Sequence, residues 1–176
     1  MMKDLVLLAV SLVLVAAAVE DMARLRISNI FPLLVIGLYA AWVAVVGWEN
    51  DIWRNGTVFL GMFALGCGLF AMRAMGGGDV KLMSACALWF DWAGAVPWLV
   101  YVTVGGGVLA LVLMAGRRLV PQSVREGSSI ALFDKKGPIP YGVAIALGTI
   151  MALYMAGPNP SGIAHMPDFV QGLRQR

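Results

Sequence analysis

Long apolar runs, separated by short polar connectors, decide what this chain can fold into. The runs are continuous rather than alternating, which favours membrane-spanning helices over a transmembrane barrel. Of the 176 residues, 60% are hydrophobic and 13% are charged, whereas a soluble domain carries about 25% charged residues. A chain of this size cannot bury so much apolar surface in its own core. The sequence therefore predicts an all-α, polytopic membrane protein with the lipid bilayer as its solvent.

Six apolar segments are interpreted as transmembrane helices, the fourth of them short. The first could also be a signal peptide, but its flanking charges and the later runs favour a span. Ser28 or Asn29 is expected to cap the second helix, and Pro32 falls in its first turn, where a missing N–H costs little. The expected helices cover residues 5–19, 30–48, 57–72, 82–90, 97–115 and 139–156. They form one predicted domain, residues 1–157, followed by a polar tail, residues 158–176.

The fourth apolar run is the least certain span. It has about nine residues before Asp91, which is roughly 13 Å of helix against a hydrocarbon layer of ~30 Å. Two arrangements are consistent with this length. Either the helix is short and shielded by its neighbours, or Asp91 lies at membrane depth.

Lysine and arginine are distributed unevenly among the connectors. Nine of the thirteen lie in the connectors 20–29, 73–81 and 116–138, which alternate onto one side of a six-helix chain. The positive-inside rule then places these connectors in the cytoplasm and both termini outside. Asp21 and Asp79 belong to the first two of them, so we expect both aspartates at the cytoplasmic face. This expectation does not depend on any motif.

Two aspartates at one membrane face indicate a definite chemistry. Neighbouring carboxylates cannot both ionise at neutral pH, so they share a proton. The base then activates a water molecule that attacks a peptide carbonyl, and the acid protonates the carbonyl oxygen and the leaving nitrogen. Three glycines precede Asp79 and are expected to leave room for an unwound substrate backbone. Taken singly, each aspartate is also consistent with a solvated loop charge, and the glycines with a flexible turn.

Other catalytic designs have little support in the sequence. The only histidine, His165, lies in the polar tail, so a serine–histidine pair or a histidine-rich metal site is not expected. Cys67 and Cys86 lie inside apolar runs without a CxxC spacing, which is typical of small buried residues. We expect no metal and no cofactor. A net charge of +3 does not indicate a nucleic-acid partner.

Two sequence patterns carry a resemblance to a known family. Residues 76–79, Gly-Gly-Gly-Asp, complete a GxGD motif that continues with Val80 and Lys81, and Asp21 opens a D-x5-I-x-N pattern ending at Asn29. With two apolar spans between them, the patterns resemble those of the type IV prepilin peptidases, which are intramembrane aspartyl proteases. Pro140, at the start of the last helix, begins a Pro-Tyr-Gly sequence that resembles a third family feature.

The resemblance implies both a reaction and a set of site residues. The reaction is removal of a short basic leader from a prepilin or pseudopilin at the cytoplasmic face of a bacterial inner membrane. The cut would follow a glycine and precede an apolar helix with a glutamate near its start. Lys81 would orient the site electrostatically or meet that glutamate. By this resemblance the catalytic residues are Asp21 and Asp79, the supporting residues are Gly76, Gly78, Lys81 and Asn29, and the substrate contacts are Tyr141 and Gly142.

The chain also departs from the family pattern. Ser28 stands where family members often have proline, which is expected to alter loop stiffness slightly. The N-terminal domain with paired CxxC motifs of the bifunctional members is not found, so methyltransferase activity is not expected. The chain resembles the short peptidase-only branch, such as the enzymes that serve tight-adherence pili. A presenilin-like protease usually has tyrosine before its first aspartate, where this chain has Glu20.

Two other classes of function stay open at this point. The first is a transporter or proton-coupled channel that uses membrane carboxylates, although the predicted helix centres are nearly free of charge. The second is an assembly scaffold of a pilus or secretion system in which the catalytic residues are vestigial. Cleavage of a prepilin by the purified protein separates both classes from a peptidase.

Overall fold

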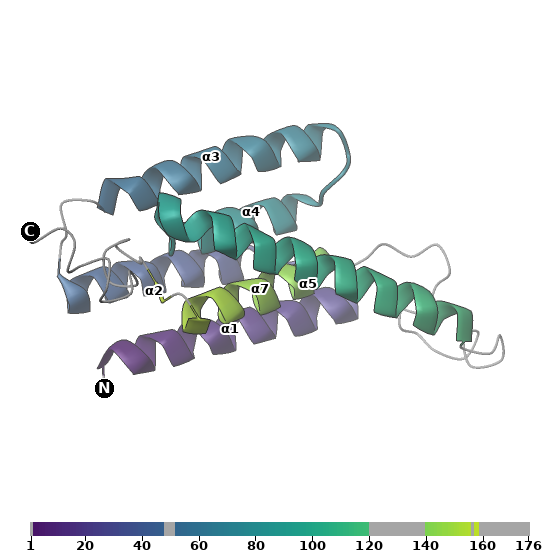
Figure 1. Cartoon of the computed structure of the whole chain (residues 1–176), viewed down its shortest axis with the longest axis horizontal. Helices are drawn as coiled ribbons and strands as arrows, with labels where there is room; N and C mark the ends of the chain where they lie inside the picture. Colours follow the sequence, from purple (N-terminus) through teal and green to yellow (C-terminus); the bar gives the residue numbers. More distant parts are fainter. Residues whose placement is uncertain (1, 48–51, 120–139, 156, 159–176) are drawn as a thin grey trace, which may run out of the picture.

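The chain is a bundle of α-helices over the residues that the structure describes (Figure 1). A computed structural model describes residues 2–47, 52–119, 140–155 and 157–158. Within them there is no strand, so the prediction of an all-α fold is confirmed for this part of the chain. The helices are α1 (Met2–Arg24), α2 (Ile30–Val46), α3 (Ile52–Ala71), α4 (Gly77–Ala87), α5 (Trp92–Leu119) and α7 (Tyr141–Met155).

Helix length divides these elements into two groups. Three helices are long and apolar enough to cross a membrane, over Met2–Arg24, Ile52–Ala71 and Trp92–Val112. The helices α2 and α7 are apolar but have only 17 and 15 residues, and α4 has 11. Six spans and external termini stay predictions. The predicted tail, apart from its first residue, and most of the basic connector 116–138 lie outside the described residues.

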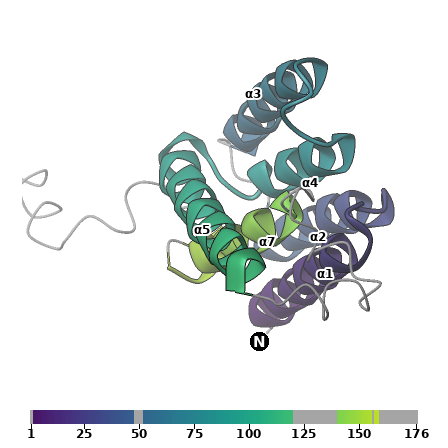
Figure 2. The ribbon, with the colours of Figure 1, turned by 90° about the vertical axis from the view of Figure 1, so that its right-hand side faces the viewer.

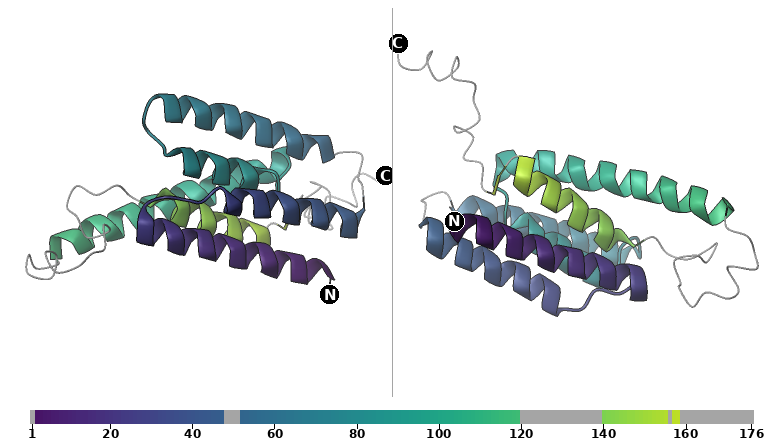
Figure 3. Two further views of the ribbon diagram at one scale, coloured as in Figure 1. Left: turned by 180° about the vertical axis from the view of Figure 1, so that it is seen from behind. Right: turned by 90° about the horizontal axis from the view of Figure 1, so that it is seen from below.

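Helices α4 and α7 form the centre of the bundle. In the end-on view of Figure 2, α7 lies among α1, α4 and α5, with α3 outermost. Figure 3 shows α1 and α2 running side by side along the opposite face. Helix α3 packs mainly on α4, and its buried residues are Asn55, Met62 and Gly66. The two helices that begin near the candidate site are therefore the most enclosed ones.

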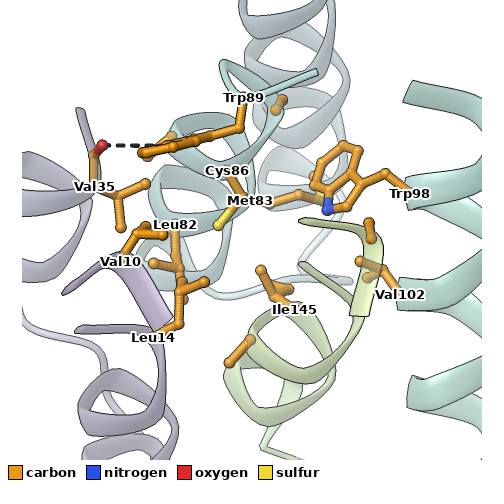
Figure 4. Packing of buried hydrophobic residues seen from close by; sticks show 14 of the residues in the cluster. Val10, Leu14, Val35, Leu82, Met83, Cys86, Trp89, Trp98, Val102 and Ile145 are labelled. Carbon is orange, nitrogen blue, oxygen red and sulfur yellow. Dashed lines mark hydrogen bonds between the residues drawn. The ribbon is translucent and has the colours of Figure 1, made fainter. Parts of the chain in front are cut away.

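Aromatic side chains fill the middle of the bundle. Trp89, Phe90 and Trp98 are fully buried, and their apolar area is a main contribution to core stability. The Trp89 Nε1–H donates to the Val35 carbonyl at 3.3 Å, and the Trp98 Nε1–H donates to Thr149 Oγ1 at 2.9 Å. Both indole N–H groups are thus satisfied without water. Figure 4 shows the two rings with α4 side chains between them.

Small residues let α7 approach its neighbours closely. Ala144, Gly148 and Ala152 are all buried on this helix. A Cβ added at Gly148 would lie 2.6 Å from the backbone of Val102 on α5. The two backbones are therefore nearly in contact, as expected where small residues recur at four-residue spacing between membrane helices.

Three predicted connectors are partly helical, so those boundaries were wrong. Helix α1 continues through Asp21 to Arg24, α3 begins at Ile52 instead of residue 57, and α4 begins at Gly77 so that Asp79 lies in its first turn. The predictions ended each helix where its apolar run ended. A helix does not have to end with its apolar run, however, because its backbone hydrogen bonds continue through polar residues, and Asp21 and Asn55 are buried within the bundle.

The fourth and fifth helices also differ from the prediction. Helix α4 ends at Ala87, and α5 begins at Trp92, so Pro97 lies inside α5 instead of opening it. Asp91 precedes α5, and its carboxylate accepts the Gly94 N–H at 2.8 Å. A carboxylate in this position satisfies a free N–H of the first turn. Helix α4 is thus short and shielded by its neighbours, as in one of the two arrangements left open by the sequence, and Asp91 acts as a helix cap.

Candidate active site

Asp21 lies near the end of α1, where it is 4% exposed. Its Oδ2 accepts a hydrogen bond of 2.8 Å from the Gly142 N–H, in the first turn of α7. The first N–H groups of a helix have no partner within the helix and carry a partial positive charge, so a carboxylate there is stabilised. Gly142, expected as a substrate contact, is thus a hydrogen-bond donor to Asp21.

Asp79 lies in the first turn of α4, a helix that is not among the candidate spans. Its Oδ1 is buried without a hydrogen-bond partner among the described residues. Burial, and secondarily the nearby charge of Asp21, raise the pKa of Asp79 to about 6, against the lowering effect of a hydrogen bond with the Gly76 backbone. Asp79 therefore keeps a proton at a pH where a surface aspartate is ionised.

The two carboxylates line the same two cavities. The larger cavity has a volume of about 610 Å³ and the smaller about 220 Å³, and Asp21 and Asp79 belong to the walls of both. Arg73 lines the larger cavity, and Arg26 the smaller. Tyr141 also lines the larger cavity and is 42% exposed. The structure thus brings together the two aspartates and the tyrosine that the sequence singled out.

Ile27 fills the space between the two aspartate-bearing regions. A Cβ at Gly78 would lie 3.1 Å from Ile27 Cβ and from its carbonyl oxygen. A Cβ at Gly142 would lie 2.7 Å from Ile27 Cδ1 and 2.8 Å from Asp21 Oδ2. Both glycines are therefore needed for contact between Ile27 and the helices α4 and α7. In the sequence, Ile27 is notable only as part of the D-x5-I-x-N pattern, because an aliphatic side chain carries no chemistry of its own.

The glycine run before Asp79 is packed more closely than expected. A Cβ at Gly76 would lie 2.8 Å from Asp79 Oδ2, and one at Gly77 would touch the Phe70 ring at 3.4 Å. With Gly78 against Ile27, the space at these glycines is filled by the chain itself. The three glycines were expected to leave room for a substrate backbone, and this expectation was wrong for the space beside each glycine. All three nevertheless line the smaller cavity.

Asn29 and Lys81 form a separate contact. The Lys81 ammonium donates to Asn29 Oδ1 at 2.9 Å. Asn29 occupies the cap position of α2 but makes no side-chain cap hydrogen bond there, so the predicted capping role was wrong. Both residues line an apolar groove of about 350 Å³ to which neither Asp21 nor Asp79 belongs. Since Lys81 follows Asp79 by two positions on a helix, it points away from it.

Two further cavity residues have no signal in the sequence. Leu25 and Arg73 follow the ends of α1 and α3, and both line the larger cavity. They are the non-glycine residues with positive φ in the described part of the chain, at 52° and 59°. This left-handed backbone costs free energy in a residue with a Cβ and is found preferentially at functional sites.

A comparison with protein families identifies the chain. The model of the type IV leader peptidase family matches residues 8–111, which is more than half of the 176 residues. The chain belongs to the type IV leader peptidase family. The resemblance inferred from the motifs is thereby confirmed. The matched segment of this family member contains both Asp21 and Asp79, whereas Gly142 lies beyond it. No curated protein and no solved structure matched the chain.

Proposed function

We propose that this family member is an intramembrane aspartyl endopeptidase that removes the leader from type IV prepilins or pseudopilins. The observation that carries the proposal is that Asp21 and Asp79 line the same cavities in a chain of the leader peptidase family. Three helices long and apolar enough to cross a membrane support a membrane location. Two carboxylates that share one proton form the acid–base pair of aspartic proteases.

The surroundings of the two carboxylates favour different roles for them. Asp79 has a buried Oδ1 without a donor and a pKa raised to about 6, so we assign the proton to Asp79. Asp21, held by the Gly142 N–H, is the base that takes a proton from the attacking water. The water oxygen bonds to the peptide carbon while Asp79 protonates the carbonyl oxygen. Collapse of the tetrahedral intermediate then breaks the C–N bond: the leaving nitrogen takes the proton that Asp21 received from water, and a hydroxyl of the intermediate returns a proton to Asp79 as the carboxylic acid product forms.

The proposed site faces the cytoplasm of a bacterial inner membrane. The uneven distribution of lysine and arginine supports this orientation, since nine of the thirteen lie in the predicted connectors 20–29, 73–81 and 116–138, and the first two of these contain the aspartates. The substrate would be a short basic leader followed by an apolar helix.

Lys81 serves this site by holding Asn29 and not by touching the aspartates. The hydrogen bond of 2.9 Å between the two side chains supports this role. An alternative is that the ammonium meets the glutamate of the substrate. A charge exchange tests the alternative, with Lys81→Glu in the enzyme and lysine in the prepilin. Recovered cleavage would show direct pairing, and continued loss would count against it.

Cleavage of a purified prepilin in detergent tests the proposed function. We expect the wild-type protein to release the leader, and Asp21→Asn and Asp79→Asn to be folded and inactive. Asp91→Asn is the matched control, because Asp91 is also a buried carboxylate but caps a helix, and asparagine caps equally well. Full activity of either active-site variant would refute the pair. A folded wild-type protein that releases no leader would favour a transporter or a scaffold.

A further inference from the structure

The segment between α1 and α2, residues 25–29, is held by a hydrogen bond at each of its last two residues. Glu20 Oε2, on α1, accepts the Ser28 N–H at 2.9 Å. Lys81, on α4, donates to the Asn29 side chain at 2.9 Å. Neither bond belongs to a helix ladder or a cap. The segment is therefore fixed by side chains of the two helices that carry the candidate carboxylates.

Ile27 occupies the middle of this segment, next to Ser28. Its backbone and Cβ lie against Gly78, and its Cδ1 lies against Gly142. Gly78 directly precedes Asp79, and Gly142 donates its N–H to Asp21. A displacement of Ile27 therefore changes where α4 begins relative to α1 and α7. The position of Ile27 sets the geometry of the carboxylate pair.

Glu20 is well placed to fix Ile27. Its side chain is only 20% exposed, and its other described contact is a longer pair of 3.4 Å with Arg24, whose side chain is 75% exposed. An exposed pair within one helix contributes little. The Ser28 N–H, in contrast, gives a charge-assisted hydrogen bond that joins residues eight positions apart. The backbone of the segment is thus anchored to the residue directly before Asp21.

We propose that Glu20 is a positioning residue, which fixes Ile27 between Gly78 and Gly142 through the Ser28 N–H and so sets the placement of Asp21 and Asp79. The expected effect on cleavage rests on the proposed function. The role of Glu20 in fixing residues 25–29 does not depend on that function. Glu20 acts in this role as a hydrogen-bond acceptor. The positioning role does not require the negative charge of Glu20.

Three variants separate positioning from an effect of charge. Glu20→Ala removes the acceptor, so we expect kcat for prepilin cleavage to fall by about 10- to 100-fold with KM unchanged, as for a small misplacement of reacting groups. Glu20→Gln removes the charge but keeps an acceptor oxygen, and is expected to stay within about threefold of wild type. Arg24→Ala removes only the exposed ion pair of Glu20 and is expected to leave cleavage unchanged.

Amide hydrogen exchange of the peptide that contains Ser28 gives a second readout that needs no substrate. We expect faster exchange in Glu20→Ala and wild-type exchange in Glu20→Gln. Equal exchange in wild type and Glu20→Ala would overturn the proposal, as would equal loss of cleavage in the Ala and Gln variants. If the wild-type protein fails to cleave prepilin, the proposed function fails, and the exchange experiment still decides whether Glu20 holds the segment.

Discussion

Adding one methyl group at Gly142 is a sharp test of the candidate site. In Gly142→Ala the new Cβ would lie 2.8 Å from Asp21 Oδ2 and 2.7 Å from Ile27 Cδ1. Ordinary contacts need about 3.5 Å or more, so the carboxylate must move by several tenths of an ångström. The N–H bond to Asp21, now 2.8 Å, would be stretched beyond the ~3.2 Å limit of a good hydrogen bond.

The expected loss follows from the energy of that bond. A hydrogen bond to a charged group contributes about 1.5–3 kcal/mol, which corresponds to about 10- to 100-fold in rate if the bond acts only through the orientation of Asp21. The net loss of stability should not exceed about 2.5 kcal/mol, because two opposing effects act on it. Overpacking costs about 1–3 kcal/mol, and replacing glycine in a helix returns roughly 0.5–1 kcal/mol. We therefore expect a folded protein with strongly reduced prepilin cleavage. Cleavage and the melting temperature are to be measured on the same preparation.

Two other glycines supply the controls for this experiment. Gly107→Ala adds a methyl group where no atom lies within 4 Å, so cleavage should be unchanged and stability slightly higher. Gly148→Ala places a Cβ 2.6 Å from the Val102 backbone, so stability and cleavage should fall together. Wild-type cleavage by folded Gly142→Ala would refute the reasoning, because it would show that Asp21 does not act from its position beside α7.

The other predictions concern pH, the connector and the core. The pKa of Asp79 is about 6 in the fold, against 3.8 for an ordinary aspartate, so ionisation is disfavoured in the folded protein. Cleavage should fall as pH rises through about 6, and Asp79→Asn should equal wild type in stability near pH 4 but exceed it above pH 6. The full pKa shift corresponds to a stability difference of about 3 kcal/mol between the two proteins, or roughly 1–2 kcal/mol after allowance for solvent screening of this half-buried carboxyl group. Equal melting temperatures of wild type and Asp79→Asn at pH 8 would contradict this prediction. Lys81→Met and Asn29→Ala should each destabilise the protein, and in the double variant their effects should be non-additive, with a coupling energy of about 0.5–1.5 kcal/mol. Additive shifts in melting temperature would mean that the hydrogen bond between the two side chains does not contribute to stability. Trp98→Phe should cost about 1–3 kcal/mol through its lost bond to Thr149 and leave cleavage at low temperature intact, and a selective loss of cleavage would argue against a purely structural role.

Hydropathy predicted the presence of the helices better than their ends. Apolar runs report which residues meet lipid or core, and they located all six described helices. They do not report where backbone hydrogen bonds stop. Asp21 and Asp79 were therefore assigned to connectors, although each lies within a helix. The alternation of basic connectors nevertheless predicted that they share a face, and the structure places both in the same cavities.

The contacts that shape the site could not be predicted from one sequence. The hydrogen bond between Gly142 and Asp21 joins residues 121 positions apart, and no local pattern reports such a pairing. Ser28 was expected to alter loop stiffness slightly and was one of two candidates to cap the second helix. In the structure its N–H, which a proline would lack, binds Glu20. Packing around Ile27 is equally invisible in the sequence, because it depends on the absence of side chains at two distant glycines.

The short helix α4 has a consequence for the supply of water. At 1.5 Å per residue, the 20 residues of α3 extend about 30 Å and the 11 residues of α4 about 16 Å. A bilayer matched to α3 is therefore about twice as thick as α4 is long. In such a bilayer at least one end of α4 would lie below the membrane surface, where non-helical backbone is either buried in protein or lines a water-filled cavity. The proposed hydrolysis needs water as a reactant, and a helix about half as long as α3 would give the aqueous phase a route to Asp79.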